Sequence, residues 1–233
     1  MSLKEFEDRI LNDLLPEFCN DPARRYGTTG FKPDFGAVDD ADAQGFLQGL
    51  DAGLVKLVGR MYRAPRSHAG EQFFWEHGRD TKPRAITLWI EPIITVATLS
   101  RFHFELGWPK ELLGTQSVDD AFDAMAYVSS DTTSEYVACE VKKTTKELDF
   151  LTRTMLKLST LPPTANVVNK EKNAYRKIKA LRARRAPFFW AVGPGGGSVA
   201  FKLTYLDGGP IIFDEVAVRN LGYPLSPTAS TTI

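Results

Sequence analysis

Three charged residues interrupt apolar sequence near the middle of the chain, and together they could carry out phosphoryl chemistry. Asp123 lies within the apolar run from Ala121 to Ala126, and Glu140 and Lys142 fall in the run that begins at Tyr136. A charged side chain in a buried strand is costly unless it is paired or put to use. We therefore expect these three residues to belong to a functional site.

The alternation of side chains along a strand predicts how these residues meet. Successive side chains point to opposite faces, so Glu140 and Lys142 share one face and Cys139 faces the other way. Pairing between neighbouring strands can then bring Asp123 beside Glu140. Cys139 is expected in the core, which argues against a catalytic thiol.

Two carboxylates and a lysine suit phosphodiester hydrolysis. Aspartate and glutamate oxygens bind hard divalent cations such as Mg²⁺ or Mn²⁺, which keep several waters as ligands. Such an ion acidifies a bound water and offsets charge that develops on the phosphate. Lys142 could orient or help deprotonate the nucleophile, or stabilise the transition state. The predicted catalytic residues are Asp123, Glu140 and Lys142, with Asp123 and Glu140 as metal ligands.

This arrangement resembles the PD-(D/E)xK nuclease superfamily, in which an acid on one strand is followed by Glu/Asp-x-Lys on the next. The matching residues are Asp123 and, on the next strand, Glu140-Val141-Lys142, although Phe122 stands where the family often has proline. The resemblance implies a restriction-endonuclease-like fold, an Mg²⁺ or Mn²⁺ cofactor, and DNA as the substrate. It also makes Glu91, on the first core helix, a candidate third metal ligand. Many such enzymes dimerise to cut both strands, so a homodimer is an open option.

A concentrated basic segment lies in a chain of zero formal net charge. Residues 170–185 hold eight lysines and arginines and one glutamate, so the segment is +7 and the remainder, with 21 basic and 28 acidic residues, is −7. Such a helix could lie along a nucleic-acid backbone and neutralise phosphates. A solvated helix face explains the segment equally well. The residues predicted to bind nucleic acid are Lys172, Arg176, Lys179 and Arg182.

Hydrophobic periodicity predicts the elements that must position the site. Helices are expected from residue 3 to Pro16, at about 43–62, 92–106, 145–158 and 168–184, and the segment 85–90 is ambiguous between strand and helix. Strands are expected at about 112–116, 122–128, 136–143, 188–192, 199–205 and 211–218. The glycine-rich residues 193–197 lack the Gly-Lys-Ser/Thr ending of a phosphate loop, so we expect a hairpin turn.

These elements predict an α/β protein with a mixed β-sheet flanked by helices. We expect an N-terminal helical extension at 1–84, a restriction-endonuclease-like α/β core at 85–223 and a flexible tail at 224–233. The composition is that of a soluble globular protein. With only two cysteines, no basic apolar leader and no apolar run of about 20 residues, a cytoplasmic location without a membrane partner is expected.

Two alternatives to a nuclease are consistent with the same residues. The first is a catalytically inactive nuclease-fold protein that binds nucleic acid or a protein partner and keeps the basic helix. The second is an α/β scaffold in which the charges of Glu140 and Lys142 lie on a solvated strand face. Burial of the two side chains distinguishes the second alternative from the other hypotheses.

Overall fold

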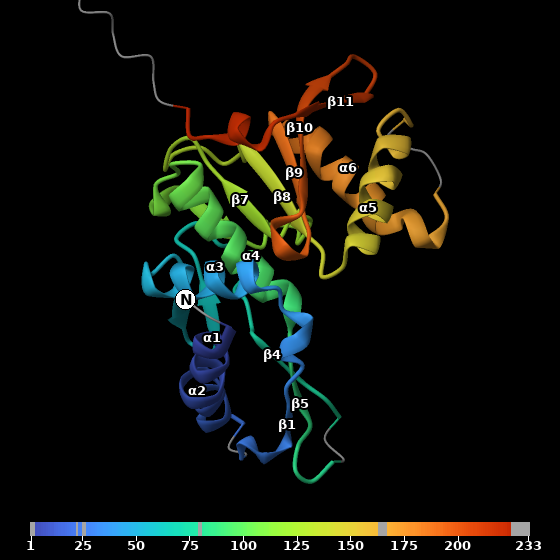
Figure 1. Ribbon diagram of the computed structural model, residues 1–233. Helices are drawn as coiled ribbons and strands as arrows, with labels where there is room; N and C mark the ends of the chain where they lie inside the picture. Colours follow the sequence, from blue (N-terminus) through green and yellow to red (C-terminus); the bar gives the residue numbers. More distant parts are fainter. Residues whose placement is uncertain (1–2, 22, 25–26, 79–80, 163–166, 225–233) are drawn as a thin grey trace, which may run out of the picture.

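The protein is a mixed α/β protein in which a six-stranded sheet occupies one half of the molecule. The computed structural model describes residues 3–21, 23–24, 27–78, 81–162 and 167–224, so the predicted tail lies outside the described residues apart from Pro224. Figure 1 shows the sheet in the upper part, with the N-terminal helices and a smaller sheet below it.

The large sheet has the strand order β11-β10-β9-β8-β7-β6, in which only β8 and β9 are parallel among the described strands. Its strands are β6 (Leu113–Thr115), β7 (Ala124–Ala126), β8 (Val137–Val141), β9 (Phe188–Val192), β10 (Ser198–Tyr205) and β11 (Ile211–Val216). Each predicted strand is present. The glycine-rich turn joins the antiparallel strands β9 and β10, as expected.

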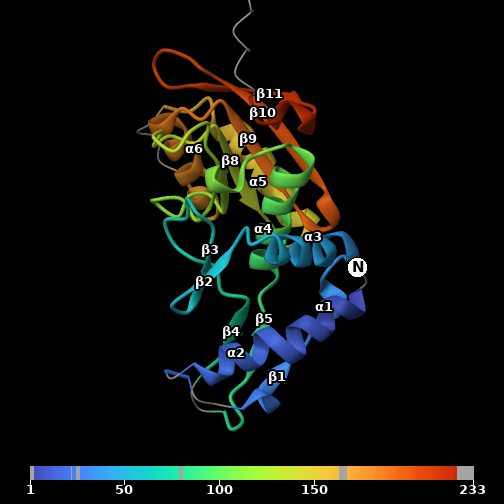
Figure 2. The same cartoon turned by 90° about the vertical axis from the view of Figure 1, so that its left-hand side faces the viewer.

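Helices cover both faces of this sheet. Helix α4 (Ile90–Ser100) continues through a π-helical turn at Arg101–Glu105, and α5 (Thr145–Leu158) and α6 (Lys172–Arg184) form the connection between β8 and β9. In Figures 1 and 2, α4 lies against one face and the α5–α6 pair against the other. A helical connection is what a parallel pair of strands requires.

The sheet separates two apolar clusters, because alternate residues of its strands point to opposite faces. Cys139, Val141 and Trp190 pack in the cluster that contains α4 and the N-terminal helices. Met125, Ala138 and Phe189 pack in the cluster that contains α5 and α6. The predicted alternation along β7 and β8 is therefore confirmed, and Cys139 is a buried free thiol.

The N-terminal part contains strands as well as helices, which corrects the prediction of a helical extension. Strands β1 (Phe31–Lys32), β4 (Phe74–Glu76) and β5 (Ile86–Leu88) form a sheet of order β1-β5-β4, and β2 (Lys56–Val58) pairs with β3 (Met61–Arg63). Helix α3 (Asp40–Asp51) ends where Gly53 adopts a positive φ of 66°, and Gly59, with φ 65°, turns the β2–β3 hairpin. The predicted helix 43–62 is wrong beyond residue 51, because these two glycines interrupt the apolar spacing.

The first helix also extends further than predicted. Helix α1 (Leu3–Arg9) leads through a π-helical turn at Ile10–Leu14 into α2 (Leu15–Asn20), so Pro16 does not end the helical segment. Leu15 N–H donates to the Ile10 carbonyl across the wider turn, and Pro16 falls in the first turn of α2. A proline is tolerated there because the N–H groups of a first helical turn need no partner within the helix.

Helices α3 and α4 join the two parts through close packing. A Cβ atom built on Gly49 would lie 2.8 Å from Val96 Cγ1 and from Ser100 Oγ, so glycine permits the approach of the two helices. The Ser100 hydroxyl donates to the Gly45 carbonyl at 2.5 Å. Helix α4 is therefore held from both sides, by the large sheet and by α3.

Candidate active site

Asp123 lies at the end of the sheet where β7 begins, opposite the end of β8. The β7–β8 register pairs Ala124 with Cys139, and one further step places Asp123 opposite Glu140. The backbone N–H of Asp123 donates to the Cys139 carbonyl at 2.9 Å. Its Oδ2 accepts from Val141 N–H at 2.8 Å, so the carboxylate is fixed against β8.

Glu140 is buried between two lysines. Only 2% of its surface is exposed, and its Oε1 lies 2.7 Å from Lys142 Nζ. Its Oε2 lies 2.6 Å from the Nζ of Lys177, which is also 2% exposed. The solvated strand face considered as an alternative is therefore excluded for Glu140.

Lys177 is a site residue that the sequence analysis did not single out. It comes from α6, and its Nζ also donates to the Ala121 carbonyl at 2.7 Å. Position 177 follows Ala174 by three residues and precedes Leu181 by four, so it lies on the apolar side of α6. That placement of a lysine on an apolar helix face was the available signal, and the dense surrounding charge obscured it.

The surroundings shift the pKa values of the two carboxylates, Asp123 and Glu140, in opposite directions. Burial raises the pKa of Asp123 well above its ordinary value, and the nearby Glu140 charge raises it further. Burial also acts to raise the pKa of Glu140, but the Lys177 and Lys142 ammonium groups outweigh it and hold that pKa below its usual range. Glu140 is thus the stable anion of the pair, and Asp123 retains a proton more readily.

Glu91 approaches the site from the first turn of α4. Its Oε1 lies 3.6 Å from Lys142 Nζ, which links the helix to the end of β8. Burial acts to lower the pKa of Lys142, but Glu140, with Asp123 and Glu91, outweighs it and raises that pKa. The predicted residues Asp123, Glu140 and Lys142 therefore gather in one place, and Glu91 lies at its border.

The candidate site offers at most two carboxylates, those of Asp123 and Glu140, as ligands for a hard cation. Among the described residues, no group of three or more His, Cys, Asp or Glu side chains has the geometry to hold a metal ion. Two carboxylates are enough for Mg²⁺ when waters and substrate phosphates complete its coordination. Asp123 Oδ1 and the remaining lone pairs of the Glu140 oxygens are available for that role.

The basic helix contributes less surface charge than its sequence suggests. Lys172, Arg176 and Lys179 are exposed on α6, and their contact with nucleic acid stays a prediction. Arg182 is turned towards the protein: its Nε donates to the Gly209 carbonyl at 2.6 Å, and its Nη2 donates to those of Ser159, at 3.1 Å, and Leu161. These three bonds occupy the guanidinium and argue against the predicted contact of Arg182 with nucleic acid, which no observation tests.

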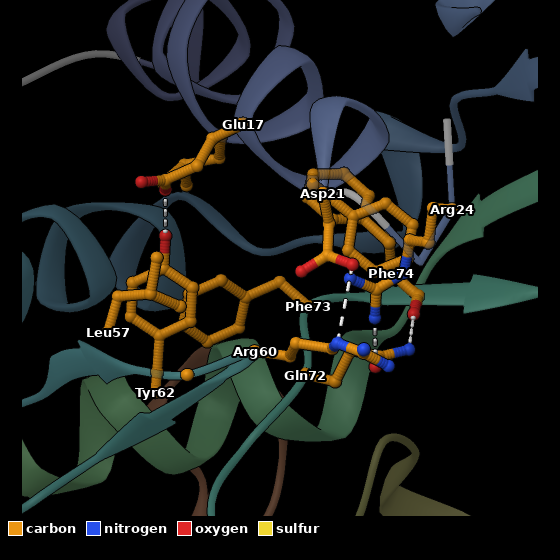
Figure 3. A pocket seen from close by; sticks show the side chains of 12 residues that line it. Glu17, Asp21, Arg24, Leu57, Arg60, Tyr62, Gln72, Phe73 and Phe74 are labelled. Carbon is orange, nitrogen blue, oxygen red and sulfur yellow. Dashed lines mark hydrogen bonds and ion pairs between the residues drawn. The ribbon is translucent and has the colours of Figure 1, made fainter. Parts of the chain in front are cut away.

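A small hollow between α2 and the β2–β3 hairpin has no group of residues comparable to the cluster around Glu140 among the described residues. Figure 3 shows Tyr62 pointing to Glu17 and Arg60 to Asp21, and the pairs lie 2.7 and 3.3 Å apart. The hollow measures about 30 Å³, which is enough for about one water molecule. Its polar groups are thus used to fasten α2 to the hairpin.

Comparisons with known proteins do not assign the chain to a family. No protein-family model, no curated protein and no solved structure matches it. In the described part of the chain, no helix combines the length and apolar character needed to cross a bilayer.

Proposed function

We propose that the protein is a metal-dependent nuclease of the PD-(D/E)xK type with a restriction-endonuclease-like core. The observation that carries the proposal is the cluster of Asp123, Lys142 and the buried Glu140 at one end of two adjacent strands. Buried charges of this kind are expensive to maintain, and they concentrate at functional sites.

The order of elements supports the same proposal. Helix α4 is followed by the antiparallel strands β6, β7 and β8, then by α5 and α6, and finally by β9, which is parallel to β8. The superfamily that the sequence resembles has this succession of a helix, three strands, a helix and a strand. The candidate residues lie where its site would be, on the second and third strands.

Each residue has a role that follows from its position. Asp123 and Glu140 would hold Mg²⁺ or Mn²⁺, which supplies an activated water and offsets charge on the phosphate. Lys142, 16% exposed at its side chain, reaches the open end of the site and would orient the attacking water. Lys177, which reaches Glu140 from α6, would keep Glu140 ionised and hold its carboxylate in place. DNA is the proposed substrate because the resemblance is chiefly to enzymes that cut DNA.

A non-catalytic function is the second candidate, and one observation favours it. Both Glu140 oxygens already accept hydrogen bonds from lysines, as expected for a charge cluster that is complete without a metal. A protein of this kind would bind nucleic acid or a protein partner without cutting. The two candidates differ in magnesium-dependent cleavage.

The decisive experiment measures cleavage of plasmid DNA and labelled oligonucleotides by the purified protein. We expect cleavage with millimolar Mg²⁺ or Mn²⁺, none with EDTA, and a loss of about 10²-fold or more in Lys142→Ala and Glu140→Ala. Lys143→Ala is the matched control, because Lys143 is the exposed neighbour of Lys142. It should retain the parent rate.

Thermal unfolding and circular dichroism must accompany these rates, because Glu140→Ala leaves two lysines without their carboxylate. Folded Lys142→Ala protein that cleaves at the parent rate would overturn the proposed mechanism. Parent protein that binds DNA but cleaves none under any divalent cation would favour the non-catalytic alternative.

A further inference from the structure

The candidate active site opens onto a hollow of about 560 Å³ between α5 and the start of α6. Lys142 and Glu91 of the candidate site belong to its lining, and the other lining residues are Lys146, Glu147, Phe150, Leu151, Lys170, Asn173 and Ala174. A volume of this size lies within the range of about 300–1,000 Å³ typical of small-molecule sites. The hollow is therefore large enough for one nucleotide, next to the proposed chemistry.

Phe150 is an aromatic side chain in the lining of this hollow that is open to water. Its residue is 44% exposed, and it follows Lys146 by one helical turn, so the ring and the ammonium group lie on the same face of α5. Single exposed apolar side chains are common on protein surfaces. A phenylalanine within a concave site, beside a lysine, has the composition of a base-stacking platform.

The hollow has a net charge of +1, because three lysines, Lys142, Lys146 and Lys170, and two acids, Glu91 and Glu147, line it. Neither Lys146 nor Lys170 forms an ion pair with any residue in the described ranges. Of the two acids that line the hollow, Glu147 accepts from the Thr144 hydroxyl at 3.0 Å in the cap of α5. The other, Glu91, lies beside Lys142. The two free lysines therefore favour a phosphate-bearing ligand.

We propose that this hollow binds an unpaired nucleotide of single-stranded DNA, with its base stacked on Phe150 and its phosphates on Lys146 and Lys170. The neighbouring phosphate would then lie at Lys142. In a duplex the faces of the bases are stacked on each other, so only an unpaired base can present its face to Phe150. The inference rests on the proposed function and narrows its substrate to a strand that is at least locally single-stranded.

The test is the affinity of the full chain for a labelled oligodeoxythymidine, measured by fluorescence anisotropy in EDTA so that no cleavage occurs. Phe150→Ala should weaken binding by about 5- to 150-fold, the range for loss of one stacked base. Phe150→Trp should bind at least as tightly as the parent. Leu156→Ala is the matched control, because Leu156 is 39% exposed on the same helix but does not line the hollow.

Charge variants and a duplex complete the test. Lys146→Ala and Lys170→Ala should each lower the slope of log affinity against log salt by about 0.7 for the single strand. Phe150→Ala should leave the affinity for a blunt duplex of the same length unchanged. Unaltered single-strand binding by folded Phe150→Ala, or equal losses for strand and duplex, would overturn the inference.

Failure of this inference is distinguishable from failure of the proposed function. If Phe150→Ala weakens single-strand binding while the parent protein cleaves nothing, the inference that the hollow binds an unpaired nucleotide is supported and the nuclease proposal fails. If the parent cleaves duplex DNA with Mg²⁺ and Phe150→Ala binds the single strand like the parent, the nuclease proposal stands and the inference about the hollow fails.

Discussion

Glu140 owes its charge to two lysines that approach it from different elements. Lys142 follows it on the same strand, and Lys177 reaches it from α6 with hydrogen bonds to Glu140 and to the Ala121 carbonyl. A buried ion pair contributes little net stability when it is intact, because both charges lose their hydration. Removing one partner is different, since the other charge remains buried and uncompensated.

Lys177→Met should therefore lower the free energy of unfolding by about 3–5 kcal/mol. Denaturant unfolding monitored by tryptophan fluorescence would measure the change. Lys172→Ala is the control on the same helix, where an exposed side chain should change stability by less than about 0.5 kcal/mol. A Lys177→Met variant as stable as the parent would show that Lys142 alone compensates Glu140.

At the scale of elements, the sequence predicted the strands of the large sheet and the helices α4, α5 and α6, because their periodicity was regular. It failed where conformation depended on single residues, as with the positive φ of Gly53 and Gly59. For the site, alternation placed Glu140 and Lys142 correctly on one face. Alternation could not place Lys177 or Arg182. A run of basic residues on a helix does not reveal which of its side chains will be buried against a neighbouring element.

The contacts of Arg182 with neighbouring elements should stabilise the fold. Its guanidinium donates to carbonyls at the end of α5 and in the turn between β10 and β11, so α6 is fastened to two segments that are distant in sequence. Arg182→Ala should lower the free energy of unfolding by about 2–3 kcal/mol through loss of charge-assisted hydrogen bonds.

The same denaturant measurement checks this prediction, with Arg176→Ala as its comparison. Arg176 is exposed six residues earlier, and within the described part of the chain its guanidinium bonds only Asn173 of its own helix. The two variants should also differ in DNA binding. Arg176→Ala should reduce the salt dependence of binding, and Arg182→Ala should not once the protein is folded. Equal stabilities would show that Arg182 does not fasten α6.

At the scale of the whole molecule, the N-terminal part and the large sheet share one apolar cluster. Phe6 and Phe46 belong to the same cluster as Trp190 and Val192, so the first 84 residues complete the core on the α4 face of the sheet. Polar contacts cross the same junction: His68 N–H donates to the Gln116 carbonyl, and Gln116 Nε2 donates to Glu71 Oε1 at 2.9 Å. The two parts are expected to unfold together.

Glu71 makes that junction sensitive to pH. Burial raises its pKa to about 7, opposed by the Gln116 hydrogen bond and reinforced by Glu91. Because the folded protein holds this proton more tightly than the unfolded chain, the stabilisation is complete below the unfolded pKa and is lost as pH rises through about 7.

The contribution of Glu71 to the free energy of unfolding should fall by about 2–3 kcal/mol between about pH 5 and pH 8. Glu71→Gln, which stays neutral and still offers an acceptor to Gln116, should flatten this part of the profile. Burial also raises the pKa of Asp42, to about 6, so its contribution to the free energy of unfolding falls with pH in the same direction. The quantity to measure is therefore the difference between the pH profiles of the parent and of Glu71→Gln. Parallel profiles would contradict the assignment to Glu71.

The outermost strand of the large sheet, β11, leaves a row of backbone groups that pair with β10 on one side only among the described strands. An open row of this kind can recruit a strand from another molecule and begin aggregation. In β11, Asp214 and Glu215 are adjacent and exposed, so an incoming copy would bring acids against acids. Because like charges on facing strands repel, these two acids disfavour the pairing of β11 with the same strand of a second copy.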